Sequence, residues 1–246
     1  MCATLTLAQG LPPVESPPES PPAPNQAVAP VMPAVRKLDN TRFQIGEVVL
    51  DQKTREIRFP AEVNMTEDLL EYLIVHQDGK VHESLLVTET SPTHINLAFT
   101  LLRYTPSPEL YPLPNATGGT SGDFPEVSAE VRAAARIRID VEWMDEGKIR
   151  RIPLNEWVQH ETKTTAMPAG PWVYGGSVFE NGVYTPEITG DIAVISIIGF
   201  CMISYPGEDH DNDGVWIPFP KRVPAKGTEV TVVIAPYQTA PPIPNP

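Results

Sequence analysis

The sequence predicts an α+β domain that is predominantly antiparallel β-sheet, with about ten short strands and one or two helices. Three observations predict it. Apolar and polar residues alternate with period two over much of the chain, which is typical of half-buried strands. An Asp-Gly pair lies between two apolar runs, and one segment repeats its apolar residues at helical spacing.

The clearest strand begins at Arg136. Ile137, Ile139, Val141 and Trp143 alternate there with charged residues, so one face is expected in the core and the other in solvent. A turn at 145–147 then predicts a hairpin with residues 149–152. Further strands are expected at 43–50, 56–59, 172–178, 192–198 and 230–235, each bounded by Gly, Pro or Asp.

The run 69–88 predicts a second hairpin. Asp78 and Gly79 suit a two-residue type I′ turn, because both of its central residues need positive φ. The predicted register pairs Val75 with His82 and Ile74 with Glu83 in an antiparallel ribbon.

A helix is expected directly after this ribbon. Ser91 can cap it and Pro92 can occupy its first turn, and its apolar face is Ile95, Ala98, Phe99 and Leu102. Residues 126–135 have alanine-rich helical propensity but run into the strand at Arg136, so their state stays open. Residues 106–125 read as a long loop.

The ends of the chain differ from its middle. Nine prolines fall between 11 and 34, where Glu15 and Glu19 are the only charges, so we expect a proline-rich spacer. Residues 1–40 are predicted to be a signal-peptide remnant plus this disordered spacer, 41–236 a β-rich domain, and 237–246 a proline-rich disordered tail. A truncated signal peptide predicts a secreted or periplasmic protein.

Composition narrows the function classes. A net charge of −13 disfavours nucleic acid and anionic membrane surfaces, because both are bound through Lys and Arg. Cys2 and Cys201 are too few for a disulfide framework, a four-thiolate zinc site or an iron–sulfur cluster. The longest apolar run, 192–203, is shorter than the roughly 20 residues of a membrane-spanning helix, so no transmembrane segment is expected.

Several segments resemble the YdjY-domain family of bacterial exported proteins: IGEVVLD at 45–51, RFPAEVN at 58–64, LEY at 70–72, KVHESLL at 80–86, EW at 142–143, PWVYGGS at 171–177 and VPAKGTEVT at 223–231. The resemblance covers about residues 42–236. It implies one domain and export, and it transfers no catalytic residue, because the family has no established activity.

One candidate site lies in the predicted ribbon. His82, Ser84 and Glu71 would share a face, with Glu83 beside them, and imidazole, hydroxyl and carboxylate are the parts of an activated nucleophile. Residues two apart on a strand lie roughly 6 to 7 Å apart, longer than the ~3 Å that a nucleophile and its base require. A buried histidine with a satisfied hydrogen bond is the favoured interpretation.

Two metal sites are weaker hypotheses. His82 and His94, with a nearby glutamate, could bind a transition metal, although their spacing matches no motif. Asp209, Asp211 and Asp213 resemble the first half of a calcium loop, but Pro220 stands where an EF-hand needs glutamate. An acidic solvated turn is the favoured interpretation, and His160 is assigned to the surface or to the ordinary core.

Four tryptophans, Trp143, Trp157, Trp172 and Trp216, could line a sugar or peptide groove, with Trp216 the best candidate for exposure. We therefore expect a non-catalytic extracytoplasmic binding or structural module that engages an envelope protein or glycan. Its oligomeric state stays open. The alternatives are a metal-dependent or hydrolytic enzyme built on His82, and a component of an exported redox or metal-handling system.

Overall fold

The computed structural model describes residues 33–117, 119–197 and 199–238. Its strands are β1 Val35–Lys37, β2 Arg42–Ile45, β3 Val48–Asp51, β4 Glu56–Val63, β5 Tyr72–His76, β6 Ser84–Thr88, β7 Arg136–Asp145, β8 Lys148–Pro153, β9 Val158–His160, β10 Trp172–Tyr174, β11 Phe179–Glu180, β12 Val183–Tyr184, β13 Asp191–Val194, β14 Ile203–Ser204, β15 Trp216–Pro218 and β16 Glu229–Pro236. The helices of these residues are α1 Pro92–Leu101, α2 Ala129–Ala134 and α3 Thr185–Thr189, with short 3-10 turns at Val81–Glu83 and Leu154–Trp157.

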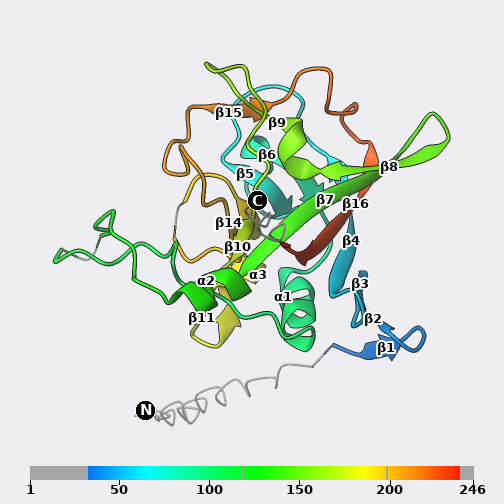
Figure 1. Ribbon diagram of the computed structural model, residues 1–246, viewed down its shortest axis with the longest axis horizontal. Coiled ribbons are helices and arrows are strands. Elements are labelled where there is room, and N and C mark those ends of the chain that lie inside the picture. The colour runs from blue at the N-terminus through cyan, green and yellow to red at the C-terminus, as the bar shows by residue number, and fades with distance from the viewer. Residues whose placement is uncertain (1–32, 118, 198, 239–246) are drawn as a thin grey trace, which may run out of the picture. The chain divides into compact units, whose positions relative to one another are not determined.

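The predicted α+β class is wrong, because the protein is mostly β and its main sheet closes on itself. Eight strands follow one another around a barrel in the order β4, β16, β7, β10, β14, β13, β5 and β6, and β6 pairs again with β4. Figure 1 shows β16 between β7 and β4. Closure leaves no open edge within the ring, and the helices are too short to form a layer of their own.

The barrel interior is apolar because inward positions alternate along each long strand. Ile57, Phe59, Ala61 and Val63 of β4 are buried, as are Val230, Val232 and Ile234 of β16 and Ile137, Ile139 and Val141 of β7. The predicted strand at Arg136 and its hairpin with β8 are therefore confirmed.

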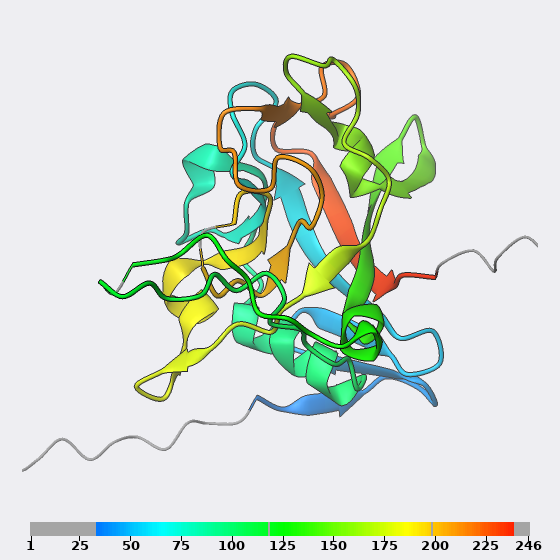
Figure 2. The ribbon, with the colours of Figure 1, turned by 60° about the vertical axis from the view of Figure 1, so that its left-hand side comes forward.

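Helix α1 is also confirmed. The Ser91 side chain accepts a hydrogen bond from the backbone N–H of His94, and Pro92 occupies the first turn. Phe99 of α1 stacks on Tyr174 of β10, with ring centroids 4.0 Å apart. Figure 2 shows α1 beside the strands β1 to β3. Residues 129–134 of the segment left open form α2.

The predicted antiparallel ribbon over 69–88 is wrong. β5 and β6 pair in parallel, with Tyr72 opposite Ser84 and Ile74 opposite Leu86. The connecting residues 77–83 are fewer than the dozen or so that parallel neighbours usually need. This link instead folds back over the outer side of the barrel, where Val81 packs on a cluster formed by Tyr72, Val75, Val194 and Cys201.

Gly79 was expected to form a type I′ turn, but in the structure it allows two backbone segments to approach closely. Neither Asp78 nor Gly79 has positive φ. A Cβ on Gly79 would lie 3.0 Å from the carbonyl oxygen of Thr189, and one on Gly190 would lie 2.6 Å from the Gly79 Cα. The glycine therefore permits close backbone approach rather than a type I′ turn.

Two further boundaries differ from the expectation. The single strand expected at 43–50 is the hairpin of β2 and β3, because Gly46 turns the chain with φ +55. β1 lies at 35–37, within the segment 1–40 that was assigned to the remnant and spacer, and pairs with β2. Residues 1–32 of that segment, Cys2 among them, and residues 239–246 of the predicted tail lie outside the described residues. No helix of the described part is long and apolar enough to cross a membrane.

Candidate functional site

The residues of the first candidate site lie in the β5–β6 link and at the start of β6. The buried histidine favoured from the sequence is wrong: His82 is exposed, and its Nε2 lies 3.3 Å from the Glu83 carboxylate. Ser84 is fully buried, and its hydroxyl donates to the carbonyl of Val81 at 3.2 Å. The activated-nucleophile hypothesis stays a prediction, and these contacts direct the imidazole and the hydroxyl to different partners.

Glu71 lies just before β5, and its backbone N–H donates to the carbonyl of Glu83 at 3.1 Å. Burial raises the pKa of the Glu71 carboxyl, and the negative charge of Glu83 raises it further, while Lys80 opposes the shift. The Glu71 carboxyl therefore lies in a partly buried, negatively charged setting next to the parallel pairing of β5 and β6.

The acidic loop after β14 contains a buried histidine contact. Asp209 lies 3.2 Å from Nε2 of His160 and 3.2 Å from Nζ of Lys163. The Lys163 hydrogen bond is the main cause that lowers the Asp209 pKa, and His160 contributes. Because the Lys163 backbone N–H donates to Nδ1 of His160, the ring's own proton belongs on Nε2, facing Asp209. His160 thus joins β9 to this loop.

The structure does not gather the residues of the two metal hypotheses into a ligand cluster. These residues are Asp209, Asp211, Asp213, His82 and His94. Within the described residues, no group of three or more His, Cys, Asp or Glu side chains could hold a metal ion. The His94 ring instead lies against Gly46, where a Cβ would approach its Nδ1 to 2.4 Å. His210 Nδ1 lies 2.7 Å from the carbonyl of Gly207.

A groove with a volume of about 770 Å³ lies on the outer face of the barrel. It crosses β7, β16, β4 and β6 and is hereafter the outer groove. Its lining combines five carboxylates with eight apolar residues and contains no Lys, Arg or His. The carboxylates are Glu47, Glu62, Glu89, Glu142 and Glu229, and the apolar residues are Pro60, Ala61, Val81, Val87, Trp143, Met144, Ile149 and Val230.

Strand register explains how these carboxylates meet. Glu229 of β16 stands directly opposite Glu62 of β4, and Glu62 is opposite Val87 of β6. Both glutamates are exposed. Like charges directly opposite each other destabilise a sheet, so this pairing costs stability instead of supplying it. Local rules of this kind are broken mainly at functional sites.

The groove carboxylates differ in their partners. Glu142 is tied to Arg58 and Arg151. Among the described residues, Glu47, Glu62, Glu89 and Glu229 form no ion pair, although Glu47 accepts a weak hydrogen bond from the Thr90 hydroxyl at 3.5 Å. The negative charge of the groove is therefore largely uncompensated.

An ion-pair network covers the outer face beside the groove. Arg151 of β8 reaches Glu56 at 3.0 Å, Asp140 at 2.8 Å and Glu142 at 3.3 Å. Arg58 lines a second hollow of about 580 Å³ with Arg42, Glu56 and Asp51. That hollow carries both signs of charge and shares Glu47 with the outer groove, whereas Glu62, Glu89 and Glu229 line the outer groove and not the second hollow.

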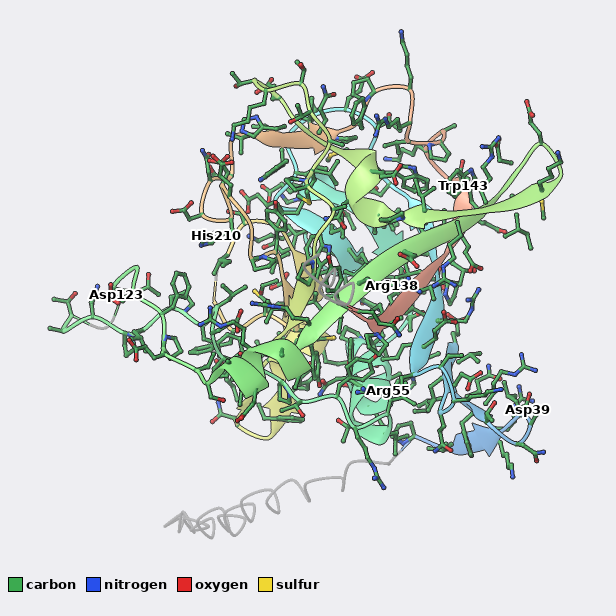
Figure 3. The ribbon with its side chains drawn as sticks, viewed as in Figure 1. Asp39, Arg55, Asp123, Arg138, Trp143 and His210 are labelled. Carbon is green, nitrogen blue, oxygen red and sulfur yellow. The ribbon has the colours of Figure 1, made fainter. Side chains whose placement is uncertain are left out.

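Apolar residues flank the groove where β7 and β8 leave the barrel. Met144 and Ile149 pair across the hairpin and are 62% and 73% exposed. Trp143, labelled on β7 in Figure 3, is half-buried. Its ring packs on that of Trp157, with ring centroids 5.0 Å apart. The exposure expected for Trp216 is wrong: its side chain is 2% exposed and donates to the Asp209 carbonyl.

Sequence reasoning missed the outer groove. The only local signal was an outward glutamate in each of two strand segments, at 62 and at 229. Nothing in either segment shows that the two strands pair, because they lie at opposite ends of the domain. Among the residues that line the outer groove, only Trp143 was also a candidate binding residue in the sequence analysis.

The model of the YdjY domain family matches residues 48–235. No curated protein matches the chain, and no solved structure matches it either. The matched range contains every strand of the barrel, with the last residue of β16 falling just outside it.

Proposed function

The chain belongs to the YdjY domain family, and from that premise we propose that it is a non-catalytic binding module whose ligand site is the outer groove and whose ligand is positively charged. One observation carries the proposal. The groove gathers five glutamates and no cationic side chain, and four of those glutamates form no ion pair within the described residues.

Electrostatic attraction is the main expected source of recognition. Clefts lined by one sign of charge raise the local concentration of oppositely charged ligands and speed their association. The net charge of −13 acts in the same direction at longer range. A neutral glycan is the weaker candidate ligand, because three of the four tryptophans, Trp157, Trp172 and Trp216, are buried and cannot stack on a sugar.

Action outside the cytoplasm is part of the proposal. What supports it is composition: the proline-rich stretch 11–34 has the character of a spacer that would hold a binding domain away from a surface. A cationic component of the cell envelope is then the expected partner.

Spermine, a small tetracation, is the direct probe. We expect calorimetry to show binding that weakens as sodium chloride rises from 50 to 300 mM, because exposed charges are screened. The double variant E62Q/E229Q should bind about tenfold more weakly, equivalent to about 1.4 kcal/mol. The control E126Q/E161Q removes two exposed glutamates that do not line the groove and should bind as the parent does.

Two results would contradict the proposal. One is the absence of any spermine binding to the parent protein. The other is equal affinity in the two double variants, which would mean that spermine responds to net charge alone.

A further inference from the structure

Resting on the proposed function of the outer groove, we infer that its occupant is an extended basic peptide segment of a partner protein, with Lys or Arg side chains alternating with apolar ones. The groove has two chemically different parts, and a small cation would use only one of them. Its glutamates would bind the basic side chains, and its exposed apolar rim would bind the apolar ones.

The apolar part argues for more than a point charge. Met144 and Ile149 are 62% and 73% exposed at one end of the groove, and Trp143 lies half-buried beside them. Covering exposed side chains of this size contributes roughly 25 cal/mol per Å² of apolar area, which an inorganic cation or polyamine cannot use fully. The described residues also contain no cluster that would concentrate the carboxylates on one metal ion.

The dimensions fit an extended chain. From β7 through β16 and β4 to β6 the groove crosses three strand spacings of about 4.8 Å, or roughly 14 Å. An extended peptide advances about 3.3 Å per residue, so four or five residues span the groove. Successive side chains of such a peptide point to opposite sides, so its Lys or Arg side chains can face the glutamates while its apolar side chains face Met144 and Ile149 at the rim.

The chain itself is a poor source of this segment. Residues 1–32 and 239–246, which lie outside the described structure, contain no Lys or Arg. A second copy carries the same net charge of −13 and is repelled at long range. Charge complementarity therefore points to a different and basic protein.

The experiment compares three capped heptapeptides, KVKVKVK, SVSVSVS and EVEVEVE, with spermine, using the full chain and calorimetry. We expect the lysine peptide to bind at least tenfold more tightly than the serine peptide, and the glutamate peptide not to bind. E62Q/E229Q should weaken the lysine peptide about tenfold. M144S/I149S should weaken that peptide about threefold and weaken spermine by clearly less, which separates the apolar contacts from the charge.

The outcomes separate this inference from the proposed function. If spermine binds and the lysine peptide gains nothing over it, or if M144S/I149S leaves peptide affinity unchanged, the peptide inference is overturned while the cationic groove survives. Should neither spermine nor the lysine peptide bind, both are overturned. Circular dichroism of each variant verifies that the fold is retained.

Discussion

Replacing Glu62 by glutamine should make the protein more stable, although the residue lies in the proposed binding site. Glu62 and Glu229 are in register on neighbouring strands, and neither forms an ion pair among the described residues. Glutamine keeps the size and hydrogen-bonding capacity of the side chain and removes the charge. The folded state then loses a repulsion, so the free energy of unfolding rises.

The magnitude follows from the register. Cβ atoms of directly opposite residues lie about 5 Å apart, and two unit charges about 6 Å apart in water repel by about 0.7 kcal/mol. We therefore expect E62Q and E229Q each to add about 0.5 kcal/mol at low salt. The double variant should add little more, because either substitution alone removes the repulsion, so the coupling energy is also about 0.5 kcal/mol.

Urea unfolding of the four proteins in this cycle measures the effect. In 50 mM salt the single variants should unfold at higher urea concentration, and in 1 M salt the gain should largely vanish, because the Debye length falls to about 3 Å. Single variants that lose stability would refute the reasoning. So would gains that are additive and insensitive to salt, since those would have nothing to do with the facing pair.

Three further predictions concern the fold. R151M should lower the free energy of unfolding by about 2 kcal/mol in urea titrations, because Asp140 is 5% exposed and loses its 2.8 Å ion pair with Arg151. A loss below about 0.5 kcal/mol would show that the ion-pair network is dispensable. Burial works to raise the Glu187 pKa, but hydrogen bonds from residues at the start of α1 outweigh it and hold the pKa below its ordinary value. E187Q should thus cost about 1 kcal/mol at pH 7, and this cost should shrink as the pH falls below 4.5 and acid protonates the parent carboxylate. A cost that does not change with pH would argue against a charge effect. G190A should cost about 2 kcal/mol more than G147A in thermal melts, because both glycines have φ near +77 but only Gly190 would place a Cβ 2.6 Å from another backbone atom; equal costs would mean that the contact relaxes freely.

The expected gain at Glu62 and the expected loss of binding in E62Q/E229Q belong together. A binding site that keeps like charges opposite each other gives up stability for function, and neutral substitutions there should reverse the exchange. A surface without a ligand would show the gain in stability and no loss of binding. Affinity measured on the same variants therefore decides whether the facing charges serve a binding site.

The elements that local chemistry defines can be predicted from the amino-acid sequence. Ser91 and Pro92 marked the start of α1, and the alternation from Arg136 identified β7 together with its turn into β8. In each case the residues that form the element also predict it. A capping side chain accepts a hydrogen bond from a backbone N–H within the first turn of its own helix, and apolar residues alternate with polar ones along a single strand. The family resemblance likewise rests on short stretches of consecutive residues.

Three features follow from long-range packing and not from any local pattern: the closed barrel, the parallel pairing of β5 with β6, and the outer groove. Asp78-Gly79 has the composition of a hairpin turn, yet packing against Gly190 uses the glycine for close approach and turns the chain back into a parallel register. Glu62 and Glu229 meet only because β16 returns to pair with β4. Strand pairing between distant segments is set by how the whole core is buried, and that information is not contained in either segment alone.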